Sequence, residues 1–136
     1  MSLFTPILQT ASCIKKLEKP ILTKDDIPYN ASLVFNAGVA KYQGKYVMIF
    51  RDDYNFEENV WPPRKKPKTI LGVAFSDDGI SWNVRKEPLF DSTTLPDDSD
   101  FRRFYDPRLT IIEGKLYVCL AMDTRHGIRG DRKSVV

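Results

Sequence analysis

The sequence predicts an all-β fold, and three observations support this prediction. Short runs of β-branched and aromatic residues, bounded by Gly, Asp, Asn and Pro, recur along most of the chain, which is typical of strands. Signals for helix starts and for amphipathic helices are scarce. A unit made of a strand, a Gly-Lys hairpin and a second strand occurs twice, with an offset of 70 residues.

Each expected strand is bounded by residues that favour turns. The predicted strands are residues 32–40, 45–51, 69–75, 81–85, 105–112 and 115–122. Gln43-Gly44 and Glu113-Gly114 are expected to form hairpin turns. Residues 76–79 (Ser-Asp-Asp-Gly) are a predicted turn, and residues 87–100, which include two prolines, a predicted polar loop.

The repeat extends the prediction from strands to architecture. Residues 44–46 (Gly-Lys-Tyr) align with 114–116 (Gly-Lys-Leu), and at the same offset 36–38 (Asn-Ala-Gly) align with 106–108 (Asp-Pro-Arg). Repeated units of short strands are typical of propeller blades, and insertions at 55–68 and 87–100 explain the long spacing. We therefore predict the N-terminal one to two blades of a β-propeller, with a generic β-meander as the alternative.

Residues 76–82 (Ser-Asp-Asp-Gly-Ile-Ser-Trp) carry a further structural signal. Asp and Gly favour the turn between two strands, and Trp82 can pack beneath it. This segment resembles the Asp-box turn of sugar-cleaving propellers. We interpret it as a structural staple rather than a catalytic motif.

Composition excludes several classes of function. The net charge of +3 is too small to indicate nucleic-acid binding, and we interpret the basic run at residues 64–68 as a solvated loop. Cys13 and Cys119 lie far apart and outside any Cys/His cluster, which argues against a disulfide framework and a zinc site. Residues 1–16 lack the pattern of a signal peptide, and no stretch reaches transmembrane length, so we expect a cytoplasmic protein.

Polar residues cluster where the predicted strands begin or end. Asn36 interrupts an apolar run, Arg51 and Asp52 end one strand, and Asp106 opens the corresponding strand of the second repeat. In a propeller the inner strands of successive blades converge on one central pocket. We therefore expect Asn36 and Asp106, as equivalent positions of two blades, to face the same pocket.

Three short stretches together resemble one enzyme family. Residues 34–38 (Val-Phe-Asn-Ala-Gly), 50–52 (Phe-Arg-Asp) and 105–110 (Tyr-Asp-Pro-Arg-Leu-Thr) are similar to signature segments of glycoside hydrolase family 130. The resemblance extends from about residue 21 to residue 129, and it is greatest to the mannooligosaccharide phosphorylases. It implies a five-bladed propeller that cleaves β-mannosides with inorganic phosphate, giving α-mannose 1-phosphate with inversion.

The resemblance also implies roles for individual residues. Asp106 matches the catalytic acid, the mannose-binding positions are Asn36, Arg51 and Asp52, and the phosphate-binding positions are Arg125 and His126. The expected partners are a β-mannoside oligosaccharide and phosphate as co-substrate, with no metal or organic cofactor, and the full-length protein could form a homo-oligomer.

Structural roles are the alternatives at four of these positions. Asp106 could cap a turn before Pro107, Arg51 and Asp52 could form an exposed ion pair, and His126 could be purely structural.

Other functions stay open at this point. An inverting hydrolase needs a second carboxylate to activate water, whereas phosphate needs positioning by cations, so one acid among basic residues favours phosphorolysis. The alternatives are an inverting β-mannosidase of the same family, a non-catalytic carbohydrate-binding propeller and a furanoside hydrolase.

The last six residues look foreign to the domain. Residues 131–136 (Asp-Arg-Lys-Ser-Val-Val) match a translation of a common sequencing adapter, and we expect them to be a non-native tail. Residues 1–130 would then be the N-terminal fragment of the propeller domain. We predict that this fragment is inactive by itself, because it would contain only part of the pocket.

Overall fold

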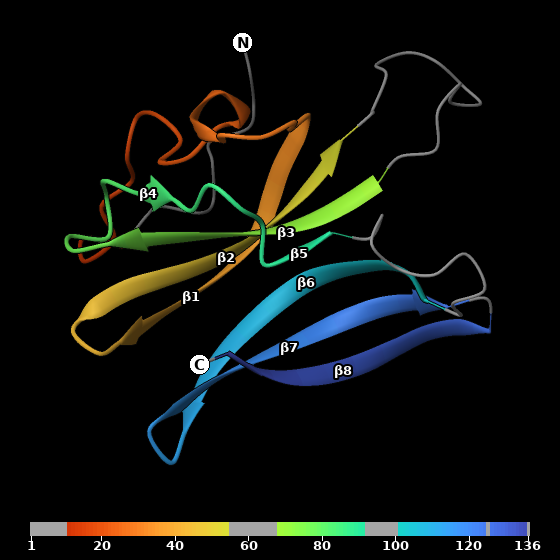
Figure 1. Cartoon of the computed structure of the whole chain (residues 1–136). Coiled ribbons are helices and arrows are strands. Elements are labelled where there is room, and N and C mark those ends of the chain that lie inside the picture. Colours follow the sequence, from red (N-terminus) through yellow and green to blue (C-terminus); the bar gives the residue numbers. More distant parts are fainter. Residues whose placement is uncertain (1–10, 55–67, 92–100, 125, 136) are drawn as a thin grey trace, which may run out of the picture.

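The chain folds into two antiparallel sheets that pack face to face (Figure 1). The computed structural model describes residues 11–54, 68–91, 101–124 and 126–135. The first sheet contains β1 (Leu33–Tyr42), β2 (Lys45–Tyr54), β3 (Lys68–Ser76), β4 (Asn83–Val84) and β5 (Phe90–Asp91). The second contains β6 (Phe101–Ile112), β7 (Lys115–Thr124) and β8 (Gly127–Val135). A single 3-10 turn, η1 (Lys24–Asp26), precedes them within the described part of the chain.

The predicted all-β fold is confirmed, with two local corrections. The fourth strand is shorter than predicted, because the turn before it occupies Ser81. The segment predicted as a polar loop contains the short strand β5: the amide of Leu89 donates to the carbonyl oxygen of Leu71 at 2.8 Å, and Phe90 pairs with Leu71. The apolar side chains of Leu89 and Phe90 pack against the core, which the polar composition of the rest of the segment did not indicate.

The 70-residue repeat is present in the backbone geometry as well as in the sequence. Phe35 pairs with Arg51 across β1 and β2, and the equivalent Tyr105 pairs with Ala121 across β6 and β7. The register shifts immediately afterwards in both hairpins, between residues 35 and 38 and between residues 105 and 108. The two sheets are therefore two copies of one structural unit, as expected for adjacent blades of a propeller.

The turn at residues 76–82 is held by side-chain hydrogen bonds. Asp78 Oδ1 accepts hydrogen bonds from the amides of Ser81 at 2.7 Å and Ile80 at 2.8 Å. These two bonds lower the pKa of Asp78 to about 2. Trp82 Nε1 donates to the carbonyl oxygen of Gly79 at 3.2 Å. All of these hydrogen bonds lie within the turn, as expected for a structural motif.

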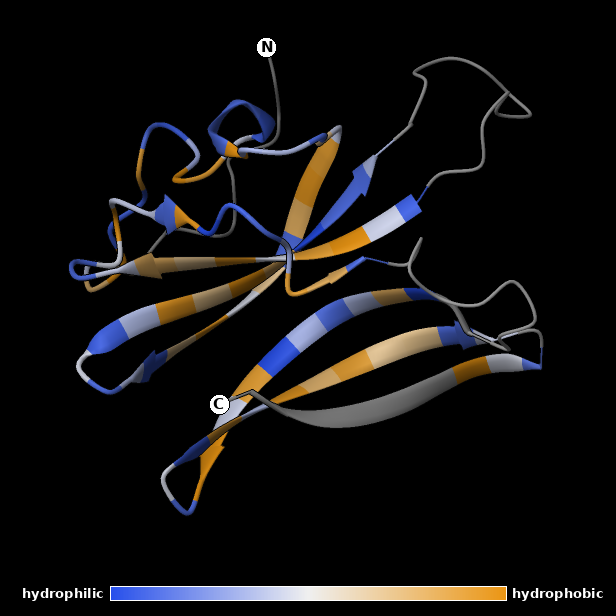
Figure 2. Cartoon of the chain, in the orientation of Figure 1, coloured by the Kyte–Doolittle hydropathy of each residue, from blue (hydrophilic) through white to orange (hydrophobic). Residues whose placement is uncertain are grey.

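The main core lies between the two sheets. Alternate residues of β2 and β3 face alternate residues of β7, and the hydrophobic segments of these strands stand out in Figure 2. The buried residues of this core are Val47, Ile49, Leu71, Val73, Phe104, Leu116, Val118, Leu120 and Met122. This packing fixes the angle between the sheets and so positions the inner strands β1 and β6.

A second, smaller core covers the other face of the first sheet. The N-terminal segment contributes Ile27, which packs with Met48, Phe50 and Ala74. Cys13 and Cys119 are free and exposed. No helix among the described residues is long and apolar enough to cross a membrane.

Gly38 lies close to the backbone of the second sheet, and replacing it by Ala should destabilise the chain. A Cβ atom at Gly38 would lie 2.6 Å from the carbonyl oxygen of Pro107, a backbone atom that cannot move aside easily. We expect Gly38→Ala to lower the free energy of unfolding by about 1–3 kcal/mol, as for other overpacking substitutions. Urea denaturation followed by circular dichroism would measure the change.

A neighbouring substitution provides the control for this prediction. Val39 is 48% exposed on the same strand, so Val39→Ala should change stability by about 0.5 kcal/mol or less. Equal stabilities of the Gly38→Ala and Val39→Ala variants would show that the strands do not meet as closely as the structure indicates.

Candidate functional site

Two equivalent positions of the repeat meet at the junction of the sheets. Asn36 Nδ2 donates a hydrogen bond of 2.6 Å to Asp106 Oδ1. Both residues lie at the bulge of an inner strand with a left-handed backbone, at φ of 49° and 51°. Asn and Asp adopt this conformation more readily than other non-glycine residues. The two side chains are therefore in direct contact, while the expectation that they face one shared pocket stays a prediction.

Asn36 and Asp106 share an uncommon backbone conformation, which points to a functional role for the positions of their side chains. Non-glycine residues in left-handed conformations are rare, and where they persist the surrounding structure enforces them. Here the bulge turns each side chain out of the regular alternation of its strand. The result is a carboxyl group and an amide group that remain accessible at the sheet junction, where Asn36 is exposed and Asp106 is half-buried.

Arg51 lies beside this pair and bridges the two sheets. Its Nε donates to Asp53 Oδ1 at 2.9 Å and its Nη2 to Asp53 Oδ2 at 2.5 Å. The guanidinium also stacks over the rings of Phe35 from β1, at 4.6 Å, and Tyr105 from β6, at 5.2 Å. Thr69 donates a further hydrogen bond of 2.9 Å to Asp53, so this carboxylate is buried and fully engaged.

The second sheet carries an equivalent acidic residue, Asp123, at the same repeat position as Asp53. Arg103 donates to Asp123 through Nε at 2.8 Å and also through Nη2, and the Tyr105 hydroxyl donates at 2.7 Å. Partial burial would raise the pKa of Asp123. The bonds from Tyr105 and Arg103 and the nearby charge of Arg51 outweigh this effect and lower it. Asp123 is therefore held as a carboxylate.

Asp52 does not join this group of residues. Side chains alternate along a strand, so Asp52 points to the face opposite Arg51 and Asp53, where it is fully buried. Its Oδ1 accepts from the amide of Ser32 at 3.1 Å, while its Oδ2 has no partner among the described residues. Burial raises the pKa of Asp52 to about 6. In this arrangement the Asp52 carboxyl has no access to a sugar.

His126, one of the two predicted phosphate-binding residues, lies between β7 and β8. Arg125 lies outside the described residues. His126 is exposed, and its backbone amide donates to Thr124 Oγ1 at 3.1 Å. A search of the described residues finds no group of His, Cys, Asp and Glu that could hold a metal ion.

Sequence reasoning missed three residues of this group: Asp53, Arg103 and Asp123. The 70-residue offset relates Asp53 to Asp123, so the repeat contained the signal that both carboxylates occupy one structural position. The site thus consists of an accessible Asn36–Asp106 pair flanked by two Arg–Asp ion pairs.

Comparison with solved structures identifies similar folds. The chain matches a protein proposed to be a glycoside hydrolase from Parabacteroides distasonis (TM-score 0.63, 23% identity, 79% of this chain and 30% of that chain). It also matches a glycosyl hydrolase from Bacteroides ovatus (TM-score 0.61, 21% identity, 80% and 30%).

A third structure has a higher sequence identity to this chain than these two. It represents the GH130 family of mannoside phosphorylases, which contains glycoside hydrolases that target β-1,2-mannosidic linkages in Candida mannan (TM-score 0.58, 25% identity, 78% and 29%). The chain spans about 30% of the length of the structures it matches. No protein-family model and no curated protein sequence matches it. These similarities and the two related sheets show an all-β, propeller-type fold of which this chain forms one part.

Proposed function

We propose that the complete protein cleaves β-mannosides with inorganic phosphate and releases α-mannose 1-phosphate with inversion. The observation that carries this proposal is the hydrogen bond between Asn36 and Asp106, which brings one accessible carboxyl group to the junction of two blades. The similarity to a mannoside phosphorylase family supports the choice of substrate.

Asp106 is the proposed proton donor. Its carboxyl would transfer a proton, through a hydroxyl of the bound sugar, to the glycosidic oxygen as the bond to the anomeric carbon breaks. A phosphate oxygen would attack that carbon from the opposite face and so invert its configuration. Asn36 holds Asp106 Oδ1 through its amide, and Oδ2 would be the oxygen that faces the sugar.

The state of the neighbouring carboxylates supports phosphorolysis over hydrolysis. A hydrolase of the inverting type needs a second free carboxylate as a base. In the group described above, Asp53 is paired with Arg51 and Asp123 with Arg103. Both carboxylates are thereby engaged, which leaves Asp106 as the accessible acid of this part of the site.

Hydrolysis is the second candidate, because the GH130 structure above belongs to a family that also contains glycoside hydrolases. In that case a free carboxylate from outside this chain would activate water.

The residues that we propose for the sugar are Asn36 and Arg51, with phosphate near His126 and Arg125. Asp52, predicted from sequence as a sugar ligand, is replaced in this proposal by Asp53, which orients Arg51.

The test is an assay of the gene completed with its downstream blades. Mannobiose should yield mannose 1-phosphate only when phosphate is present, and the 136-residue chain should give no product. Release of free mannose at the same rate without phosphate would establish the hydrolase instead. Binding of mannobiose without turnover under either condition would establish a non-catalytic sugar-binding protein.

A further inference from the structure

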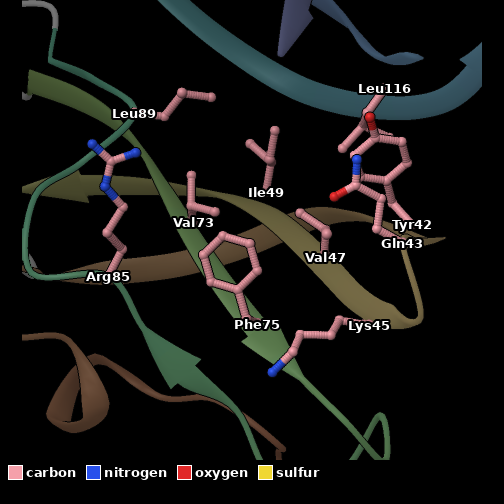
Figure 3. Close-up of a pocket in the computed structure, with 10 residues that line it drawn as sticks. All are labelled: Tyr42, Gln43, Lys45, Val47, Ile49, Val73, Phe75, Arg85, Leu89 and Leu116. Atoms are coloured by element: carbon pink, nitrogen blue, oxygen red, sulfur yellow. The ribbon is translucent and has the colours of Figure 1, made fainter. Parts of the chain in front are cut away.

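A pocket lies at the other end of β1 from Asn36, between the first sheet and β7 (Figure 3). Its volume of about 340 Å³ is within the range of small-molecule sites. The apolar part of its lining consists of Val47, Ile49, Val73, Phe75, Leu89 and Leu116. The pocket shares no residue with the proposed sugar site, so the argument for it is independent of that function.

The lining of this pocket includes two cations, Arg85 at one end and Lys45 beside Phe75. Figure 3 shows Arg85 beside Leu89 at one end and Tyr42 with Gln43 at the other, with Val47 and Val73 between them. The ends are therefore polar and the middle is apolar. A ligand that fills the pocket must match both properties.

The Arg85 guanidinium is available for a ligand. Its backbone amide donates to the carbonyl oxygen of Val73 at 2.9 Å, which anchors the residue on β3. Among the described residues, no hydrogen bond or ion pair engages its side chain. Lys45, a second cation of the lining, is paired with Asp77 at 3.3 Å. Both side chains of that pair are well exposed, so the pair is weak and can exchange for another anion.

We propose that this pocket binds a small amphiphilic carboxylate. The apolar chain or ring would pack against Phe75, which is 41% exposed, and the half-buried Leu89, where its transfer from water is favourable. The carboxylate would accept paired hydrogen bonds from Arg85, a geometry that suits the planar guanidinium.

Octanoate and octanamide provide matched probes, because they share a chain length and differ in charge. Titration of the 136-residue chain, followed by NMR, should show octanoate binding about tenfold more tightly than octanamide, as expected for a charge-assisted contact. The largest shifts should be those of the Leu89 methyl groups and the Phe75 ring.

Two substitutions test the assignment of the cation. Arg85→Gln should lower the affinity for octanoate to that for octanamide, while Lys86→Gln, a change of the adjacent exposed cation, should leave it unchanged. Both residues are exposed, so unfolding midpoints should match the unmodified chain and exclude misfolding.

Three outcomes would overturn the proposal. Equal affinities for octanoate and octanamide would indicate apolar contact without carboxylate recognition. Unchanged octanoate affinity in Arg85→Gln would remove the proposed partner. Absence of binding, or shifts confined to residues outside the pocket, would show that the cavity takes no ligand of this class.

Discussion

Replacing Asp106 by Asn in the completed protein should lower the rate of β-mannoside cleavage by about 10²–10⁴-fold, the usual contribution of a general acid. The substitution removes the proton that the proposed mechanism transfers. It keeps an oxygen that can accept the hydrogen bond from Asn36, and it keeps a residue type that tolerates the left-handed backbone at φ 51°. Steady-state assays of mannose 1-phosphate release would measure the rate.

The affinity for the sugar separates catalysis from binding in this variant. Because the replacement is nearly isosteric, the dissociation constant for mannobiose should change little while the rate falls. Asp77→Asn is the matched control, since Asp77 is an exposed aspartate whose ion pair with Lys45 lies on the surface. A rate within about threefold of the unmodified enzyme for Asp106→Asn would exclude Asp106 as the acid.

The internal repeat allowed the central pair of the site to be predicted from sequence. An offset of 70 residues relates Asn36 to Asp106, and the same offset relates their strands, their bulges and their hairpin turns. Equivalent positions of adjacent blades converge by symmetry, so the alignment of the repeat predicted that the two residues lie near each other, although it did not predict their hydrogen bond.

The orientation of residues 51–53 could not be predicted in the same way. A strand exposed on one face shows alternating polar and apolar residues, which identify the buried face. The preceding residues of β2, from Tyr46 to Phe50, are all apolar because both faces of this strand are covered. No alternation was available to show that Arg51 and Asp53 face the second sheet while Asp52 faces the N-terminal segment.

The buried position of Asp52 leads to the second large expected effect. Asp52→Asn should raise the free energy of unfolding by about 1–3 kcal/mol above pH 7. The carboxyl is fully buried, and its Oδ2 has no hydrogen-bond partner among the described residues. The Tyr29 hydroxyl is likewise buried without a partner, and its pKa is raised to about 12 by burial and by the nearby charge of Asp52. An amide at position 52 removes that charge and supplies a donor.

The pH dependence distinguishes this explanation from a general improvement in packing. The pKa of Asp52 is 3.8 in the unfolded chain and about 6 in the folded chain. The folded chain therefore holds the Asp52 proton more tightly than the unfolded chain does. The stability that this proton contributes is complete below pH 4 and is lost as the pH rises through 6. The gain from Asp52→Asn should accordingly be near zero at pH 4 and reach its full value above pH 7.

Asp53→Asn provides the opposite control on the neighbouring residue. Asp53 is paired with Arg51 and accepts a hydrogen bond from Thr69, so removing its charge should destabilise the chain at neutral pH. Urea denaturation of the three proteins at pH 4, 5, 6 and 7.5 would measure these differences. If the gain from Asp52→Asn were the same at every pH, the Asp52 carboxylate would not be the source of the instability. If Asp52→Asn instead lowered the stability above pH 7, the ionised Asp52 would have a favourable partner. The charge of Asp52 would then help to hold the N-terminal segment on the first sheet.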